Sequence, residues 1–149
     1  MPSTLHAYPE LGLIQSRFTD TVDDDALINH YRRLLKTGRE FESFRELVDF
    51  RAATEVKTTS TGLMTVGSMI GNAYKEVKSE VSAVFVAPQA LTYGMVRMYE
   101  MLSSPDVPSI QLHRTLDAAL DALEIDSPEH RTLIETASDD HPSVVWNID

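Results

Sequence analysis

Residues 48–69 read VDFRAATEVKTTSTGLMTVGSM and contain the end of an expected strand, a connecting loop and the start of an expected helix. The apolar and aromatic residues at 44–50 predict the strand, which carries an acid at Asp49 near its end. We expect the apolar helix over residues 60–78. Hydroxyl side chains favour a helix N-terminus because their oxygens accept hydrogen bonds from the first free amides. Four of them gather there: Thr58, Thr59, Ser60 and Thr61.

The elements on either side of this unit alternate between strands and helices with an apolar stripe. In chain order they are strands over residues 3–8 and 11–18, a helix over 22–37, a strand over 81–87, a helix over 89–103, a strand at 110–113 and a helix that Thr115 caps. Strands that alternate with helices need crossover connections, which place the strands parallel. We therefore predict an α/β fold with a mixed, mainly parallel sheet of about five strands, four helices packed against it and a C-terminal extension.

The chain is expected to form one α/β domain over residues 1–125, followed by an extension over residues 126–149. Ser127 and Pro128 predict a further helix at the start of the extension, since serine is a good N-cap and proline suits a first turn. The last six residues, VVWNID, contain the only tryptophan and predict a short strand or a docked tail.

Composition limits the classes of partner. The chain has 149 residues, 42% of them hydrophobic, and a formal net charge of −10. An acidic surface repels nucleic-acid backbones and anionic lipids, so we expect neither as a partner. The absence of cysteine excludes disulfides and thiol chemistry. The sequence has no signal-peptide pattern and no membrane-spanning apolar run of about 20 residues, so we expect a cytoplasmic protein.

No motif of a catalytic or metal site is present. The sequence lacks the G-x-S-x-G nucleophile elbow and the glycine-rich phosphate loops. Its five histidines do not pair at the spacings typical of metal ligands. We therefore expect a protein that is not an enzyme and has no cofactor and no metal.

The order of elements and several short motifs resemble the STAS domain of the SpoIIAA-type anti-sigma factor antagonists. In that family L-D-L in a strand is followed by D-S-S-G-L at the start of an apolar helix. Here V-D-F at 48–50 is followed by T-S-T-G-L at 59–63. SAVFVAP at 82–88 and RTLDAALDAL at 114–123 are similar to later parts of the pattern. The resemblance implies a regulatory module that binds a protein partner, such as a kinase or an anti-sigma-like regulator.

The resemblance also implies a modification site. In the antagonists, the serine after the aspartate of the helix motif is phosphorylated by a partner kinase. That serine corresponds to Ser60, whereas Thr59 replaces the family's aspartate. A helix N-terminus suits a phosphate because its free amides and dipole attract anions. The alternative is that Ser60 or Thr61 only caps the helix.

The resemblance further implies that a partner docks on the loop 51–62 and on the helix that follows. Besides Ser60, the residues expected at this contact are Thr58, Thr59, Thr61 and Gly62. The sequence leaves open whether the chain also forms a homodimer.

A second hypothesis is a protein that binds a small apolar ligand or a lipid. The helix YGMVRMYEML at 93–102 is similar to a stand-alone branch of SpoIIAA-like proteins that has been compared with a lipid-binding group. Methionine suits such a pocket because its side chain is flexible. The pocket residues expected from this helix are Tyr93, Met95, Met98 and Tyr99. The alternative is that Met95 and Met98 fill the core, while Met101 lies off their stripe and is exposed.

Overall fold

The structure of the chain, a computed structural model, describes residues 3–38, 44–74, 83–103 and 109–137. The expected end of the 60–78 helix and the terminal VVWNID lie outside these residues.

Five strands form one sheet in the order β1-β2-β3-β4-β5. β1 pairs antiparallel with β2, and the other three neighbouring pairs are parallel. This arrangement confirms the mixed, mainly parallel sheet. The strands are β1 Ser3–Tyr8, β2 Leu13–Asp23, β3 Arg45–Lys57, β4 Ala83–Val86 and β5 Ile110–His113.

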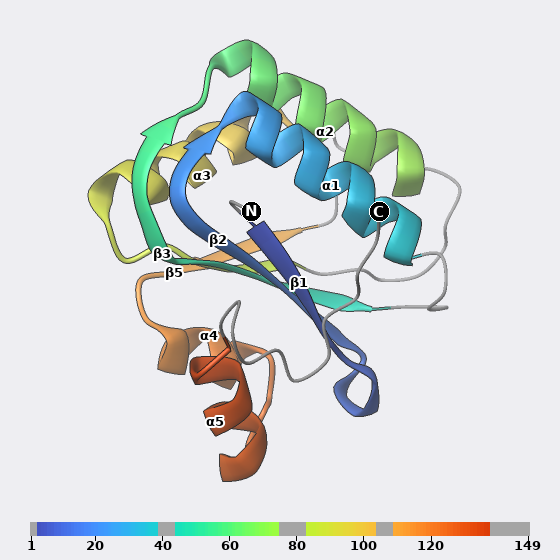
Figure 1. Ribbon diagram of the computed structural model, residues 1–149, viewed down its shortest axis with the longest axis vertical. Coiled ribbons are helices and arrows are strands. Elements are labelled where there is room, and N and C mark those ends of the chain that lie inside the picture. The colour runs from blue at the N-terminus through green and yellow to red at the C-terminus, as the bar shows by residue number, and fades with distance from the viewer. Residues whose placement is uncertain (1–2, 39–43, 75–82, 104–108, 138–149) are drawn as a thin grey trace.

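Helices cover both faces of the sheet (Figure 1). The first face carries α1 Asp24–Gly38, α2 Ser60–Tyr74 and α3 Ala90–Leu102. The second face carries α4 Leu116–Ala122 and α5 Pro128–Glu135. The expected N-caps of the last two helices are confirmed. Thr115 accepts a hydrogen bond from the amide of Ala118 at 3.2 Å, and Ser127 accepts one from the amide of His130 at 3.4 Å. The described part of the chain thus has five α-helices, the fifth being the helix expected in the extension.

The turn between β1 and β2 is the short 3-10 helix Pro9–Leu11 followed by Gly12. Gly12 has φ 57°, a left-handed conformation that glycine adopts without the steric cost of a Cβ. This turn reverses the chain between the two strands expected over residues 3–8 and 11–18.

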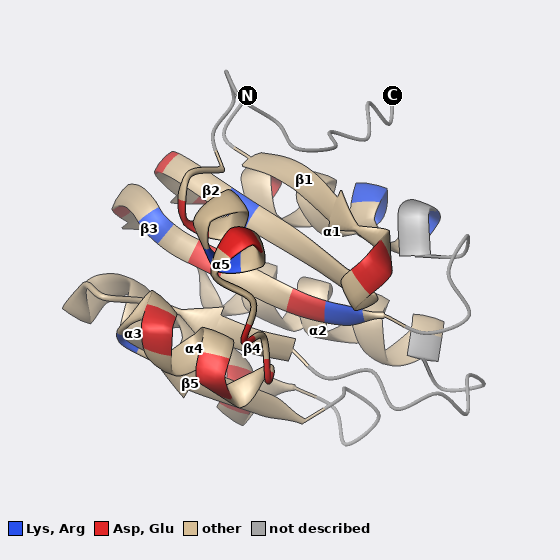
Figure 2. Cartoon of the chain, turned by 90° about the horizontal axis from the view of Figure 1, so that it is seen from below, with Lys and Arg blue, Asp and Glu red and all other residues tan. Residues whose placement is uncertain are grey.

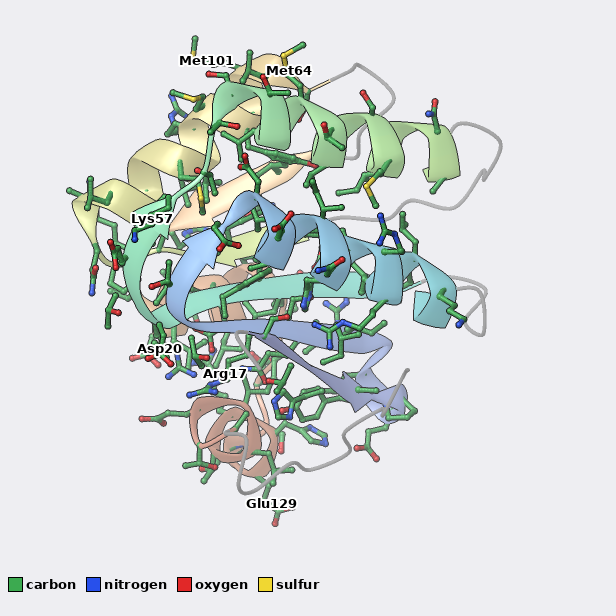
Figure 3. All side chains as sticks on the ribbon, turned by 45° about the horizontal axis from the view of Figure 1, so that its top comes forward. Arg17, Asp20, Lys57, Met64, Met101 and Glu129 are labelled. Carbon is green, nitrogen blue, oxygen red and sulfur yellow. The ribbon has the colours of Figure 1, made fainter. Side chains whose placement is uncertain are left out.

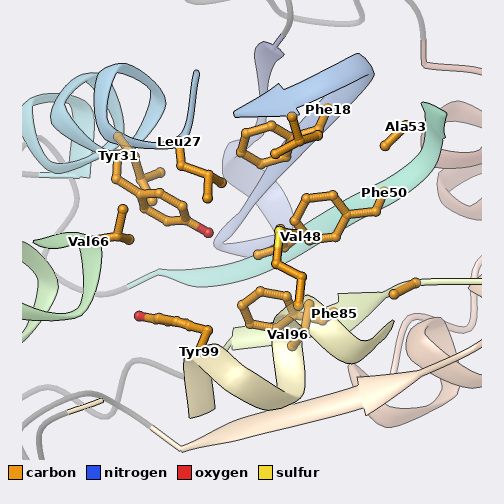
Figure 4. Packing of buried hydrophobic residues seen from close by; sticks show 14 of the residues in the cluster. Phe18, Leu27, Tyr31, Val48, Phe50, Ala53, Val66, Phe85, Val96 and Tyr99 are labelled. Atoms are coloured by element: carbon orange, nitrogen blue, oxygen red, sulfur yellow. The ribbon is translucent and has the colours of Figure 1, made fainter. Parts of the chain in front are cut away.

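Each face of the sheet has its own apolar core. Beneath α1, α2 and α3, the rings of Phe18, Phe50 and Phe85 form a row across three strands, with ring centroids 5.0 and 6.3 Å apart (Figure 4). Beneath α4 and α5, Leu47 of β3 packs in a second cluster with Ile134 of α5. Because side chains alternate along a strand, β3 contributes Val48 and Phe50 to the first core and Leu47 to the second.

The expectation of a loop over residues 51–62 is wrong, because most of these residues belong to a strand. β3 continues through Lys57 by pairing with β2, and only Thr58 and Thr59 connect it to α2. β4 pairs with β3 over residues 46–49 only, so the last part of β3 has one neighbour and exposed side chains. The polar residues at the end of β3 therefore reflect exposure to solvent and do not mark the end of the strand.

The start of α1 also differs from the expectation. β2 extends to Asp23, past two register shifts on either side of Asp20, which has φ 58°. The helix begins at Asp24, two residues later than expected. Its cap is Asp23, whose carboxylate accepts a hydrogen bond from the amide of Ala26 at 2.8 Å. The pattern of the sequence favours Asp20 or Thr21 as the cap of a helix that begins at residue 22, and both lie in β2 instead.

Candidate functional site

The candidate site lies where α1 and α2 begin. β2 and β3 are parallel neighbours, so their carboxyl ends meet at one edge of the sheet and the helices that follow them start side by side (Figure 1). α1 follows β2 directly, and α2 follows β3 after two residues. Each N-terminus presents free amides and a partial positive charge. The edge therefore favours an acidic group between the two helices.

Asp24 of α1 provides that group. Its Oδ1 accepts a hydrogen bond from the backbone N–H of Thr59 at 2.8 Å, and its Oδ2 accepts one from the Thr59 hydroxyl at 2.6 Å. The Thr59 hydroxyl oxygen in turn accepts a hydrogen bond from the amide of Gly62 at 3.1 Å. Thr59 is thus the cap of α2, and it joins that helix to α1. The alternative that Ser60 or Thr61 provides the cap is wrong.

Gly62 permits this close approach. A Cβ atom at position 62 would lie 2.0 Å from Oδ1 of Asp24, a separation that no side chain tolerates. The glycine of the T-S-T-G-L motif is therefore explained by the carboxylate beside it, and not by a special backbone conformation.

Ser60 is the first residue of α2, and its side chain does not cap the helix. Its side chain is exposed, and its hydroxyl donates a weak hydrogen bond to Sδ of Met98 at 3.8 Å. Thr61 is exposed and Thr58 is half-buried. The expected hydroxyl residues do gather at the start of α2, and Ser60 lies where this polar edge meets α3.

Next to Ser60, α2 and α3 expose large apolar side chains. We call this surface the apolar face. Figure 3 shows two of its members, Met64 and Met101, on the outer side of the helices. Met101 is 84% exposed, as expected. Met98 is 45% exposed, so the expectation that it fills the core is wrong. The five residues of the apolar face are Met64, Leu91, Met98, Met101 and Leu102.

The four residues expected to form a ligand pocket are not brought together. Met95 and Tyr99 line a small internal cavity, Met98 points outward, and Tyr93 is half-buried with Arg114 4.2 Å above its ring. The cavity measures about 20 Å³, room for about one water molecule and far below the few hundred Å³ of a ligand pocket.

The second face of the sheet holds a buried polar network that sequence reasoning missed. Asp49, 1% exposed, pairs with Arg51 at 2.8 Å and accepts a hydrogen bond from the Gln15 amide at 3.0 Å. Gln15 and Arg51 also donate to the backbone carbonyl of Ile134, near the end of α5. Figure 2 shows α5 in front of β2 and β3. Asp49, the acid of V-D-F, thus anchors α5 and lies on the face opposite Ser60.

Two titratable side chains are buried beneath α1. Desolvation raises the pKa of Glu46 to about 7, although the hydroxyl of Ser16 donates to its carboxylate at 2.6 Å. Desolvation, with a smaller contribution from the charge of Arg33, lowers the pKa of His30 to about 3. Both groups are therefore neutral in the folded protein over part of the pH range in which they would carry charge in water.

Within the ranges that the structure describes, no three histidine or carboxylate side chains are placed to share a metal ion. In the same ranges, no helix is both long and apolar enough to cross a bilayer.

A mixed sheet with the opening hairpin at one edge and helices on both faces defines a STAS-like fold. A solved structure of the anti-sigma factor antagonist SpoIIAA in its unphosphorylated form matches this chain with a TM-score of 0.51 and 13% sequence identity. The match covers 83% of this chain and 99% of that one. The chain therefore has the SpoIIAA-like fold, as its motifs indicated. No family model and no curated protein matches the sequence.

Proposed function

We propose that the chain is a non-enzymatic regulatory module that binds a protein partner through the start of α2, and that phosphorylation of Ser60 controls this binding. The observation that carries the proposal is the position of Ser60. Its hydroxyl is exposed at the first residue of a helix, beside a fixed carboxylate on one side and the apolar face on the other. A partner that covers the apolar face therefore also covers Ser60.

The position of Asp24 supports this proposal. The related family has an aspartate directly before its serine, and this chain has Thr59 there. Asp24 brings a carboxylate to Thr59 from another helix, so an acidic group remains next to the serine. The departure from the family motif is thereby compensated in space, although not in sequence.

Electrostatics gives phosphorylation a clear effect. A phosphate on Ser60 adds a charge of about −1.5 to −2. It would stand next to Thr59, which already holds the carboxylate of Asp24. Two anions would then compete for the free amides at the start of α2. We expect modification to weaken the Asp24–Thr59 contact, to add charge at the edge of the apolar face, and so to reduce partner binding.

The test compares capture of a partner from native lysate by Ser60→Ala and Ser60→Asp, with Ser68→Asp as the matched control. Ser68 is exposed on the same helix, so its variant adds the same charge away from the α2 N-terminus. We expect Ser60→Asp to capture several-fold less of a specific partner than the other two. Equal capture by all three variants would refute control by charge at Ser60. If no variant and no unmodified protein captures a specific partner, binding at this site is itself wrong.

A further inference from the structure

The apolar face has the composition of a protein interface. α2 and α3 contain 15 and 13 residues, and their only charged residues are Arg97 and Glu100, which pair with each other at 3.0 Å. A chain with 24% charged residues would ordinarily place several charges on two surface helices. Interface cores are depleted in charge and enriched in methionine. We therefore expect another macromolecule to cover the apolar face.

The exposed stripe of α3 is symmetric about Val96. Leu91 and Met101 lie five residues before and after Val96, while Gly94 and Met98 lie two residues before and after it. Spacings of three and four residues place all four on one side of the helix. A Cβ added at Gly94 would meet no atom within 4 Å, so there is open space between the large side chains.

We propose that the chain forms a homodimer in which two α3 helices pack antiparallel along this stripe. The two-fold axis passes the exposed side of α3 at the height of Val96, whose own side chain is buried on the other side, so Leu91 of each copy meets Met101 of the other. Met98 of each copy enters the open space at Gly94 of the other. The three large side chains of the stripe, Leu91, Met98 and Met101, then each have a complementary position, as a two-fold interface requires. A second copy would occupy the apolar face that the proposed partner also covers, so the two would compete, and the dimer itself does not depend on Ser60.

Charge favours a second copy at this face. The chain has a formal net charge of −10, so two copies repel wherever their acidic surfaces meet. The apolar face, with its single neutralised pair Arg97–Glu100, lets them meet without opposing like charges. A face about 20 Å long and about 20 Å wide is smaller than the roughly 800 Å² per partner of a standard interface. We therefore expect a weak dimer, with a Kd on the order of micromolar.

Cysteine cross-linking tests the geometry without background, since the chain has no cysteine of its own. A mixture of Leu91→Cys and Met101→Cys should form a disulfide-linked dimer on mild oxidation. Either variant alone should not, because two copies of position 91, or of position 101, would be about 15 Å apart along the helices. A disulfide needs Cα atoms within about 7 Å. Equal cross-linking in the single variants and the mixture would overturn the antiparallel register.

Sedimentation velocity from about 1 µM to about 200 µM tests the association itself. The wild-type mass should rise toward that of a dimer. Gly94→Lys, which fits the open space in one copy, should weaken dimerisation at least about tenfold. The control Asn29→Lys, at an exposed position on α1, should keep the wild-type Kd. A wild-type chain that stays monomeric throughout refutes the dimer. If Gly94→Lys in that case also loses a captured partner, the face belongs to another protein.

Discussion

α1 and the pair α2–α3 cover the same face of the sheet, yet their outer surfaces differ. α1 has five charged residues among 15, whereas α2 and α3 together have two. All methionines except Met1 lie on α2 and α3. Both groups bury an apolar stripe against the same core, so the fold does not account for the difference. A helix layer that is solvated on one side and apolar on the other is typical of a protein that binds through part of its surface.

The contact between the starts of α1 and α2, where the two surfaces meet, should be the most sensitive to substitution. Gly62→Ala forces the Asp24 carboxylate away from Thr59. We expect a loss of about 2–3 kcal/mol in the free energy of unfolding, from overpacking and a weakened cap. Chemical denaturation measures it. In an Asp24→Ala background the same substitution should instead stabilise the fold by up to about 1 kcal/mol, because the clash is gone and alanine is the better helix former. An equal loss in both backgrounds would disprove the role of the carboxylate.

The stability of the fold should depend on pH through the carboxyl group of Glu46. Its folded pKa of about 7 lies above the ordinary value of 4.5, so the folded state binds the proton more tightly. The contribution of Glu46 to the free energy of unfolding should therefore fall as the pH rises from about 4.5 to about 7 and change little above that. The difference in the free energy of unfolding between Glu46→Gln and wild type should therefore grow from little at pH 4 to about 2 kcal/mol in favour of the variant at pH 8. Thermal unfolding across this range gives the comparison with wild type.

The contribution of His30 to the free energy of unfolding changes with pH in the opposite direction, because its folded pKa of about 3 lies below the ordinary 6.5. Its contribution to stability is lost as the pH falls from 6.5 towards 3. A variant His30→Phe, measured beside Glu46→Gln, would separate the two. If Glu46→Gln leaves the slope above pH 5 unchanged, the carboxyl is not protonated in the fold.

On the apolar side, Gly94→Ala should stabilise the fold by about 1 kcal/mol, because alanine is the better helix former and its methyl enters open space. The same change at Gly62 is destabilising, so the two substitutions change the free energy of unfolding in opposite directions. A shift of the denaturation midpoint at low protein concentration measures this. Destabilisation by Gly94→Ala would mean that the space is not open.

The smallest effect on stability is expected for charges placed on exposed positions. Met101→Lys on α3 and Asn29→Glu on α1 should each change the free energy of unfolding by less than about 0.5 kcal/mol. Only Met101→Lys should reduce self-association, measured by light scattering. A large loss of stability in Met101→Lys would show that this methionine serves the fold.

Much of the fold could be predicted because local patterns carry it. Leu63, Val66 and Ile70 recur at helical spacing, and all three are buried. The apolar run that ends at Ala87 is a central strand, as expected. The errors fall where a segment has one neighbour only. The polar end of β3 reads as a loop because its exposed side chains lack an apolar alternation, although the backbone pairs with β2.

The site was less predictable because its contacts are distant in sequence. The hydroxyl cluster was visible, but the contact between Asp24 and Thr59 spans 35 residues and depends on the parallel order of two strands. Similarly, the role of Asp49 depends on α5, which follows it by about 80 residues. Met95 and Met98 differ by less than one helical turn, and only the position of α3 at the edge of the layer leaves one buried and the other exposed.

The claim that the apolar face mediates association can be tested directly by NMR of ¹³C-methyl methionine. Five of the six methionines lie on α2 and α3, so the spectrum observes this surface. Between about 10 µM and about 500 µM protein, the signals of Met98 and Met101 should shift or broaden, and that of buried Met95 should stay constant. If every methionine signal is unchanged over this range, or if Met95 changes as much as Met101, the face is not an interface.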